Sequence, residues 1–184
     1  MSRFSGRSLD KLWFAFFAFH LPISILLDLQ YLYPPSLIPS SLKSFMLWSI
    51  NLTRDPILLG AVNNDPTFGW LKCFSWLEAG FQVPCFVAGL WGLWNNDRRV
   101  YPVILAYGAS TATTLLPCLH TIFTTQATPP HTTAEIANLL AEYVPFLLLP
   151  LGMAVDMSWR IVKIINAADG KKNSIVRREG KLEG

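Results

Sequence analysis

Charged residues are scarce in this chain, and their scarcity excludes most soluble enzymes. Asp, Glu, Lys and Arg make up 15% of the 184 residues, against roughly 25% in an average soluble domain. Hydrophobic residues make up 52% and form several long runs. This composition indicates a polytopic membrane protein. The net charge of +3 is modest and gives no reason to expect nucleic-acid binding.

Cysteine is also rare, with only Cys73, Cys85 and Cys118, all in apolar stretches. Their odd number and lack of metal-ligand spacing favour small buried hydrophobes over a disulfide framework or a metal site. The sequence also has no phosphate-binding glycine loop and no serine–histidine triad. We therefore expect no cofactor, no metal and no catalytic residue.

Four apolar segments are predicted to cross the membrane as helices, at residues 9–33, 68–94, 101–123 and 134–161. Each is near or above the roughly 20 residues needed to cross the hydrocarbon core, where an open chain can satisfy its backbone only as a helix. The predicted fold is an all-α bundle of four transmembrane helices at 9–165. Residues 1–8 form an N-terminus, and residues 166–184 read as a basic, disordered tail.

Lys and Arg set the predicted orientation. Three precede the first segment, two lie between the second and third, and seven follow Trp159. The positive-inside rule places both termini in the cytosol. The long first loop then faces the lumen, and its apolar residues from Leu42 recur at helical spacing. We expect a short amphipathic helix there, with an unused glycosylation sequon at Asn51.

Two acids, Asp28 and Glu78, interrupt apolar segments. A charge in the bilayer is costly, so such residues face the bundle interior and usually serve a function. His20, Ser24 and Asp28 are spaced four apart and share one helix face. Glu78 and Gln82 have the same spacing. We expect these polar faces to converge on an intramembrane pocket.

If the two acids are close, they would share one proton, because ionising both is unfavourable. A site with one negative charge suits a hydrophobic molecule with a cationic amine, or a lipid with a hydroxyl group. The alternative is that both acids only hold helices together by hydrogen bonds.

Motifs along nearly the whole chain resemble the EXPERA family, in particular its sigma-2-receptor branch. They are His20-Leu21-Pro22-Ile23 with Asp28-Leu29-Gln30, Arg54-Asp55-Pro56-Ile57-Leu58, Trp70-Leu71-Lys72, Glu78-Ala79-Gly80-Phe81-Gln82-Val83-Pro84, Thr113-Thr114-Leu115-Leu116-Pro117 and Tyr143-Val144-Pro145-Phe146-Leu147-Leu148-Leu149-Pro150. Phe146 departs from the pattern, because the mammalian members of that branch have tyrosine at this position.

The resemblance implies an endoplasmic reticulum membrane protein, a homodimer, with an occluded pocket for sterols or cationic amphiphiles. It implies that Asp28 pairs with a ligand amine, that Glu78 is its protonated partner and that Asp55 is a structural acid. The other residues at positions resembling pocket-lining ones are Gln82, Tyr107, Thr114, Tyr143, Phe146 and Trp48.

Three functions remain open. The first is a non-catalytic sterol or lipid binder, with a role in sterol handling, protein quality control or mitochondrial precursor targeting. The second is a sterol double-bond isomerase, which needs one acid and one base. The third segment has no acid between Ser110 and Pro117, where isomerase relatives have glutamate. The third function is a scaffold for a transporter or precursor protein.

Overall fold

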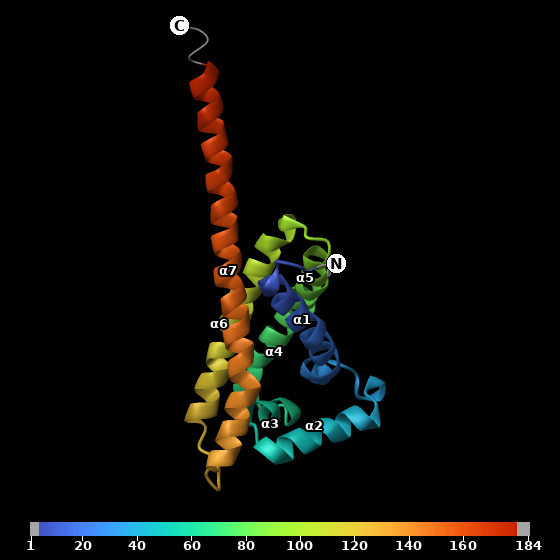
Figure 1. Ribbon diagram of the computed structural model, residues 1–184. Coiled ribbons are helices and arrows are strands. Elements are labelled where there is room, and N and C mark those ends of the chain that lie inside the picture. The colour runs from blue at the N-terminus through green and yellow to red at the C-terminus, as the bar shows by residue number, and fades with distance from the viewer. Residues whose placement is uncertain (1–3, 180–184) are drawn as a thin grey trace.

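The computed structural model describes residues 4–179, and all regular structure in that range is helical. Four segments are long and apolar enough to cross a membrane, and they pack as one bundle (Figure 1). They are Ser8–Asp28, Pro66–Trp94, Arg98–Thr124 and Thr133–Ser174. The prediction of an all-α membrane protein with four spanning helices is confirmed.

One of the spans is a single element and three are composite. The first joins α1 (Ser8–Ile23) to the π-helix η1 (Ser24–Asp28). The second consists of η4 (Pro66–Phe68), α4 (Gly69–Leu77), the π-helix η5 (Glu78–Gln82) and α5 (Val83–Trp94). The third is the short turn η6 (Arg98–Val100) and α6 (Tyr101–Thr124), and the fourth is α7 (Thr133–Glu179).

The first spanning helix is shorter than predicted. It ends at Asp28, and the chain continues through the 3-10 turns η2 (Gln30–Leu32) and η3 (Pro35–Leu37). The pair Pro34-Pro35 prevents any helix from continuing past Leu32, because proline disfavours helical backbone in the residue before it, and Tyr33 is extended.

Aromatic and aliphatic side chains of α1, α5, α6 and α7 fill the core of the bundle. The residues that are almost fully buried include Phe17, Phe86, Leu93, Ile104, Tyr107, Met153 and Met157. Helices α6 and α7 lie side by side along much of their length (Figure 1). A side-chain carbon at Gly108 of α6 would collide with the carbonyl oxygen of Pro150 in α7, so this close approach requires glycine.

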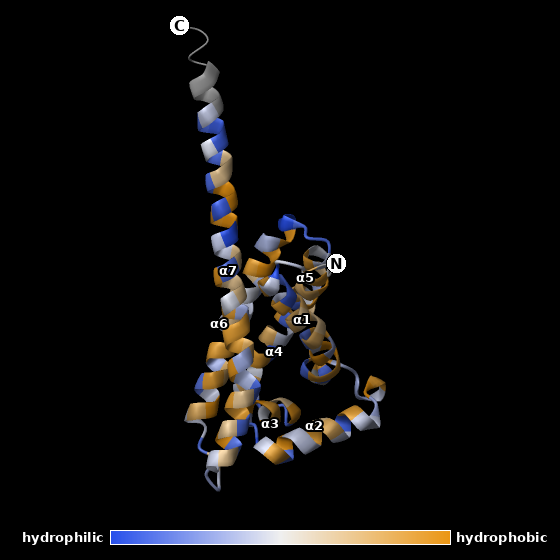
Figure 2. Cartoon of the chain, in the orientation of Figure 1, coloured by the Kyte–Doolittle hydropathy of each residue, from blue (hydrophilic) through white to orange (hydrophobic). Residues whose placement is uncertain are grey.

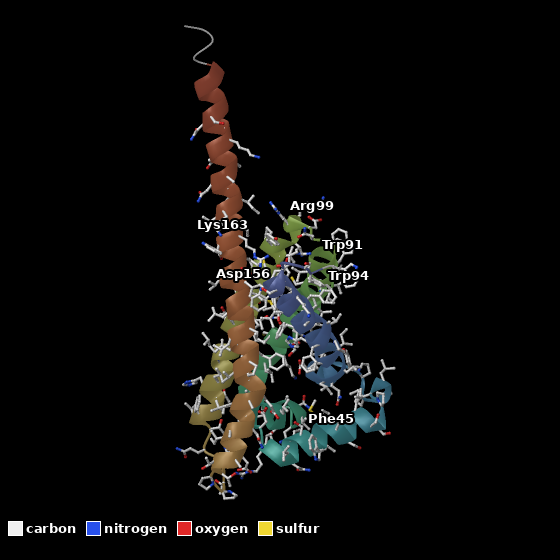
Figure 3. The ribbon with its side chains drawn as sticks, in the orientation of Figure 1. Phe45, Trp91, Trp94, Arg99, Asp156 and Lys163 are labelled. Carbon is white, nitrogen blue, oxygen red and sulfur yellow. The ribbon has the colours of Figure 1, made fainter. Side chains whose placement is uncertain are left out.

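The first loop contains two helices, where one was predicted. Helix α2 (Ser40–Thr53) lies at the end of the bundle opposite the N-terminus, with Phe45 on it (Figures 1 and 3). The short helix α3 (Pro56–Val62) follows after a sharp corner, where Arg54 has a left-handed backbone with φ of 49°. The corner is the reason for two helices, since left-handed backbone ends a helix.

An ionic network holds the other end of the bundle together. Arg160 of α7 bonds to Asp10 at 2.5 Å and to Asp156 at 2.8 Å, and Arg7 bonds to Asp10 at 2.6 Å. Trp13 of α1 donates its indole N–H to Asp156, which faces α1 from α7 (Figure 3). Asp10 is only 2% exposed, and these arginines offset the cost of burying its carboxylate.

Helix α7 extends beyond the bundle as a projecting rod with many polar residues (Figure 2). Residues 166–179 were predicted to be disordered, and the structure shows that this prediction is wrong for them. A helix already nucleated in the bundle gains one hydrogen bond for each residue added, without a new nucleation cost. The residues 180–184 of the predicted tail lie outside the described range.

Candidate functional site

The two intramembrane acids both lie in π-helical turns. The carbonyl oxygens of Ser24 and Glu78 each accept a hydrogen bond from the N–H five residues further along. Pro22 precedes the first turn and Pro84 follows the second. Because proline has no N–H, it already interrupts the α-helical ladder at both places. Such π-turns are frequent at functional sites.

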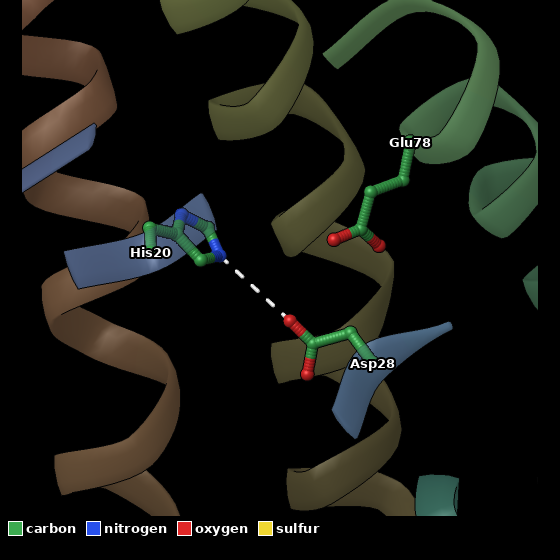
Figure 4. A group of neighbouring side chains, drawn as sticks. All are labelled: His20, Asp28 and Glu78. Atoms are coloured by element: carbon green, nitrogen blue, oxygen red, sulfur yellow. Dashed lines mark ion pairs between the residues drawn. The ribbon is translucent and has the colours of Figure 1, made fainter. Parts of the chain in front are cut away.

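The acids meet in the interior of the bundle although they come from different spans. The ligand atoms of His20, Asp28 and Glu78 all lie within 4.8 Å of one another (Figure 4). Ser24 donates its hydroxyl hydrogen to Oε1 of Glu78 at 2.5 Å. The Nε2 atom of His20 is 3.8 Å from Oδ2 of Asp28. The convergence predicted from the shared helix faces is therefore present.

This spacing makes a doubly ionised pair of carboxylates costly. Two unit charges at the upper limit of this spacing, 4.8 Å, would repel by roughly 3.5 kcal/mol at an effective dielectric constant of about 20. A single proton shared by the two carboxyl groups would remove that repulsion. The hydroxyl of Ser24 fixes the Glu78 carboxyl, whereas 43% of the Asp28 side chain is exposed. The carboxylate of Asp28 is therefore open to approach.

His20 sits in an aromatic box beside the acids. Its ring centroid is 4.6 Å from that of Phe146, 5.0 Å from Phe86 and 5.2 Å from Phe16. The hydroxyl of Tyr107 lies 3.5 Å from Nδ1 of His20. Of the residues predicted to line the pocket, Tyr107 and Phe146 therefore contact His20, and His20 in turn faces Asp28.

Two further predicted residues have hydroxyl or amide contacts nearby. Gln82 is 5% exposed, and its Nε2 lies 3.4 Å from Oγ of Ser110. Thr114 donates its hydroxyl hydrogen to the carbonyl oxygen of Thr111 at 3.0 Å, within its own helix. The Thr114 hydroxyl is therefore already used by α6, while Gln82 links η5 to α6.

Trp48 and Tyr143, also predicted to line the pocket, contact Phe45 and Asp55. Trp48 is 58% exposed on α2 and packs against Phe45, with 5.6 Å between the ring centroids. Tyr143 donates its phenol hydrogen to Oδ2 of Asp55 at 2.7 Å.

Asp55 is a fully buried acid that caps α3. Its Oδ1 accepts from the N–H groups of Ile57 at 2.7 Å and Leu58 at 3.3 Å. Burial raises the pKa of Asp55, and the bonds from Tyr143 and Ile57 act in the opposite direction. Neighbouring Arg54 donates to both carboxylate oxygens of Glu135, at 2.7 and 2.9 Å. Together these contacts fasten the α2–α3 corner to the start of α7.

The role of Ser24 is the feature of the site that sequence reasoning missed. Its spacing from His20 and Asp28 placed it on the polar face, but nothing in the sequence identified Glu78 as its partner. Ser24 is fully buried, and its partner is 54 residues away in the chain. Only a signal linking the two helices, such as correlated substitution, could have found this pair.

Comparison with known proteins gives a consistent result. The family model described as EXPERA (EXPanded EBP superfamily) matches residues 41–157. Sigma intracellular receptor 2 of Xenopus tropicalis is 29% identical over 158 residues, covering 83% of this chain and 89% of the relative. The human protein of the same name is 28% identical over 160 residues, covering 82% and 88%. Efficient mitochondria targeting-associated protein 19 of Schizosaccharomyces pombe is 28% identical over 173 residues, covering 91% and 85%.

Proposed function

The chain belongs to the EXPERA family, and from this premise we propose that it binds a sterol or a cationic amphiphile within the membrane. Asp28 pairs with the ligand's amine or hydroxyl group, and Glu78 shares its proton with Asp28. The observation that carries the proposal is the meeting of these acids from two spans, within 4.8 Å. Sigma intracellular receptor 2, which the chain resembles over most of its length, bears a receptor's name.

The division of roles between the acids follows from their surroundings. The side chain of Asp28 is 43% exposed, so an amine can reach it without displacing a neighbouring helix. Glu78 is held by Ser24 at one oxygen, and its other oxygen can carry the shared proton. A cationic amine would neutralise the single remaining charge, which lowers the cost of keeping the pair in the bilayer.

Binding of a radiolabelled cationic amphiphile to membranes tests this proposal. Wild type should bind saturably, and both Asp28→Asn and Glu78→Gln should weaken binding by roughly tenfold or more, which is a loss of about 1.4 kcal/mol or more. Asp97→Asn is the matched control, because Asp97 lies in an exposed loop and bonds to Arg99 there. Unchanged binding by folded Asp28→Asn would overturn the proposal.

We further propose the endoplasmic reticulum as the location, with both termini in the cytosol and a homodimer as the assembly. The Lys and Arg distribution supports the orientation, and the N-terminus, the loop at Arg98-Arg99 and the projecting part of α7 lie toward the same end of the bundle (Figure 1). Glycosylation sites introduced into each loop would test the orientation, and cross-linking in native membranes would test the dimer.

A sterol isomerase is the second candidate. The observation in its favour is that His20, Asp28 and Glu78 gather three proton-carrying groups at one place, as acid–base catalysis requires. Purified protein incubated with a Δ8-sterol should then yield a Δ7 product, and Asp28→Asn should abolish it. Absence of product from wild type that binds the sterol would exclude this activity.

The cellular role that we propose is sterol or lipid handling, protein quality control, or targeting of mitochondrial precursors. The name of the Schizosaccharomyces pombe relative supports the last of these. A scaffold for a transporter or precursor protein is the alternative, and the helix surface that α7 presents beyond the bundle favours it. Partners that co-purify equally with wild type and the double variant Asp28→Asn, Glu78→Gln would support the scaffold over the ligand-dependent role.

A further inference from the structure

The Nε2 nitrogen of His20 faces the carboxylate of Asp28 but does not form a hydrogen bond to it. The residue is 6% exposed, and its Nε2 points at Asp28 from 3.8 Å (Figure 4). That distance is well beyond the range of about 2.7–3.2 Å that is typical of a hydrogen bond. The nitrogen is well placed to share a third atom with the carboxylate.

The supporting contacts of the three side chains are those of a metal site. Protein metal ligands usually have an outer partner that fixes their orientation. The Nδ1 atom of His20 lies 3.5 Å from the Tyr107 hydroxyl, and Oε1 of Glu78 is bonded to Ser24. Each leaves its second ligand atom available. Asp28, with a half-exposed side chain, supplies the third ligand.

We propose that His20, Asp28 and Glu78 bind one Zn²⁺ ion. One imidazole nitrogen and two carboxylate oxygens are donors that suit zinc, whereas magnesium and calcium prefer oxygen alone. Three protein ligands leave a fourth tetrahedral position open. Donor atoms around tetrahedral zinc are roughly 3.3 Å apart. The possible donor atoms of His20, Asp28 and Glu78 lie within 4.8 Å of one another. The Nε2 atom of His20 and Oδ2 of Asp28 are already within 3.8 Å of each other.

Charge balance also favours a divalent ion. Two carboxylates and a neutral imidazole carry two negative charges, which Zn²⁺ cancels. Net neutrality reduces the cost of burying the group within the membrane. The proposal goes beyond amphiphile binding and does not depend on it. Because both ligands need Asp28, zinc and a cationic amphiphile would exclude each other.

Cobalt and zinc binding to the full chain, purified in detergent, test the proposal. Co²⁺ in a tetrahedral site gives visible d–d absorption bands, and Zn²⁺ should bleach them at one equivalent. In a competition with a chromogenic chelator, His20→Gln should weaken Zn²⁺ binding by more than the 10- to 100-fold typical of losing an outer partner. His120→Gln is the matched control, because His120 is exposed on α6.

Each outcome decides the question. Loss of the cobalt bands in His20→Gln and in Asp28→Asn, with the His120→Gln spectrum unchanged, would support the site. Unchanged zinc affinity in folded His20→Gln, or no binding by folded wild type, would overturn it. Amphiphile binding measured on the same wild-type preparation separates this result from the proposed function. Protein that binds the amphiphile but no zinc refutes the metal site alone.

Discussion

Tyr143 donates a hydrogen bond to the fully buried carboxylate of Asp55 at 2.7 Å, across 88 residues of sequence. The bond connects the N-terminal part of α7 to the N-cap of α3. It also uses the hydroxyl group of a tyrosine that was predicted to line the ligand pocket. The bond therefore couples the α2–α3 corner to the spanning helix α7.

Tyr143→Phe should lower the stability of the protein. The variant leaves Oδ2 of Asp55 buried without this donor, which costs about 1–3 kcal/mol. Tyr33→Phe is the control, because the Tyr33 hydroxyl bonds to the carbonyl of Ile25 at an exposed position; its loss should stay below about 1 kcal/mol. Thermal melting in detergent checks both, and equal melting temperatures for the two variants would contradict the expectation.

The carboxylate of Asp55 also makes the stability of the protein depend on pH, with higher stability expected at low pH. Burial raises the pKa of Asp55 in the folded protein above its ordinary value of 3.8. The folded state therefore holds the proton more tightly than the unfolded state does. The stabilising contribution of this linkage is full below about pH 4 and is lost as the pH rises through the folded-state pKa.

Asp55→Asn removes this titrating group, so a comparison of the variant with wild type isolates its effect on stability. The melting temperature of wild type minus that of Asp55→Asn should be largest near pH 4 and should decline toward neutral pH. Melting curves of both proteins at a series of pH values measure the difference. A difference that grows with pH would mean that the Tyr143 and Ile57 bonds outweigh burial.

Arg160→Met should destabilise the opposite end of the bundle strongly. It removes the arginine shared by Asp10 and Asp156, and Asp10 is almost fully buried. Breaking a buried ion pair costs about 3–5 kcal/mol. Arg99→Met breaks an exposed pair with Asp97 and should cost less than about 1 kcal/mol. Urea titration of both variants provides the measurement, and a loss for Arg160→Met no larger than for Arg99→Met would show that the network is not stabilising.

The spans and the approach of the acids could be predicted because both follow from the cost of charge in a bilayer. That cost forces Asp28 and Glu78 inward whatever the details of packing. The α2 helix was predictable for a related reason, since its apolar residues recur at helical spacing. None of these inferences requires knowledge of which atoms touch.

Features that depend on a particular contact could not be predicted. The π-turns at Ser24 and Glu78 leave no periodic signal, because they add a single residue to an otherwise helical pattern. The bond between Ser24 and Glu78 and the bond between Tyr143 and Asp55 join distant segments. The projecting end of α7 was mistaken for disorder because composition does not reveal that a helix has already been nucleated.

The prolines beside the π-turns should control ligand affinity. Pro84→Ala restores a backbone N–H and allows η5 to become α-helical, which would turn Glu78 away from Asp28. Affinity for a cationic amphiphile should fall by roughly tenfold or more. Pro117→Ala is the control, because Pro117 lies inside α6, which contains no π-turn. Equal affinity of wild type and Pro84→Ala in the radioligand assay would mean that the π-turn does not position Glu78.

Two glycines in helices should respond in opposite directions to the same substitution. At Gly108, a Cβ would collide with the backbone of Pro150 and lie 3.0 Å from the nitrogen of Ala154. Backbone atoms cannot rotate away, so α6 and α7 must separate, and Gly108→Ala should cost about 1–3 kcal/mol.

At Gly170, on the projecting part of α7, nothing lies within 4 Å of the added carbon. Gly170→Ala should instead stabilise its helix by about 0.5–1 kcal/mol, since alanine loses less backbone entropy in a helix than glycine does. Melting temperature reports the first change, and the helical signal in circular dichroism reports the second. Loss of helix in Gly170→Ala would contradict the helical state of this segment, and an unchanged melting temperature in Gly108→Ala would contradict the close packing of α6 on α7.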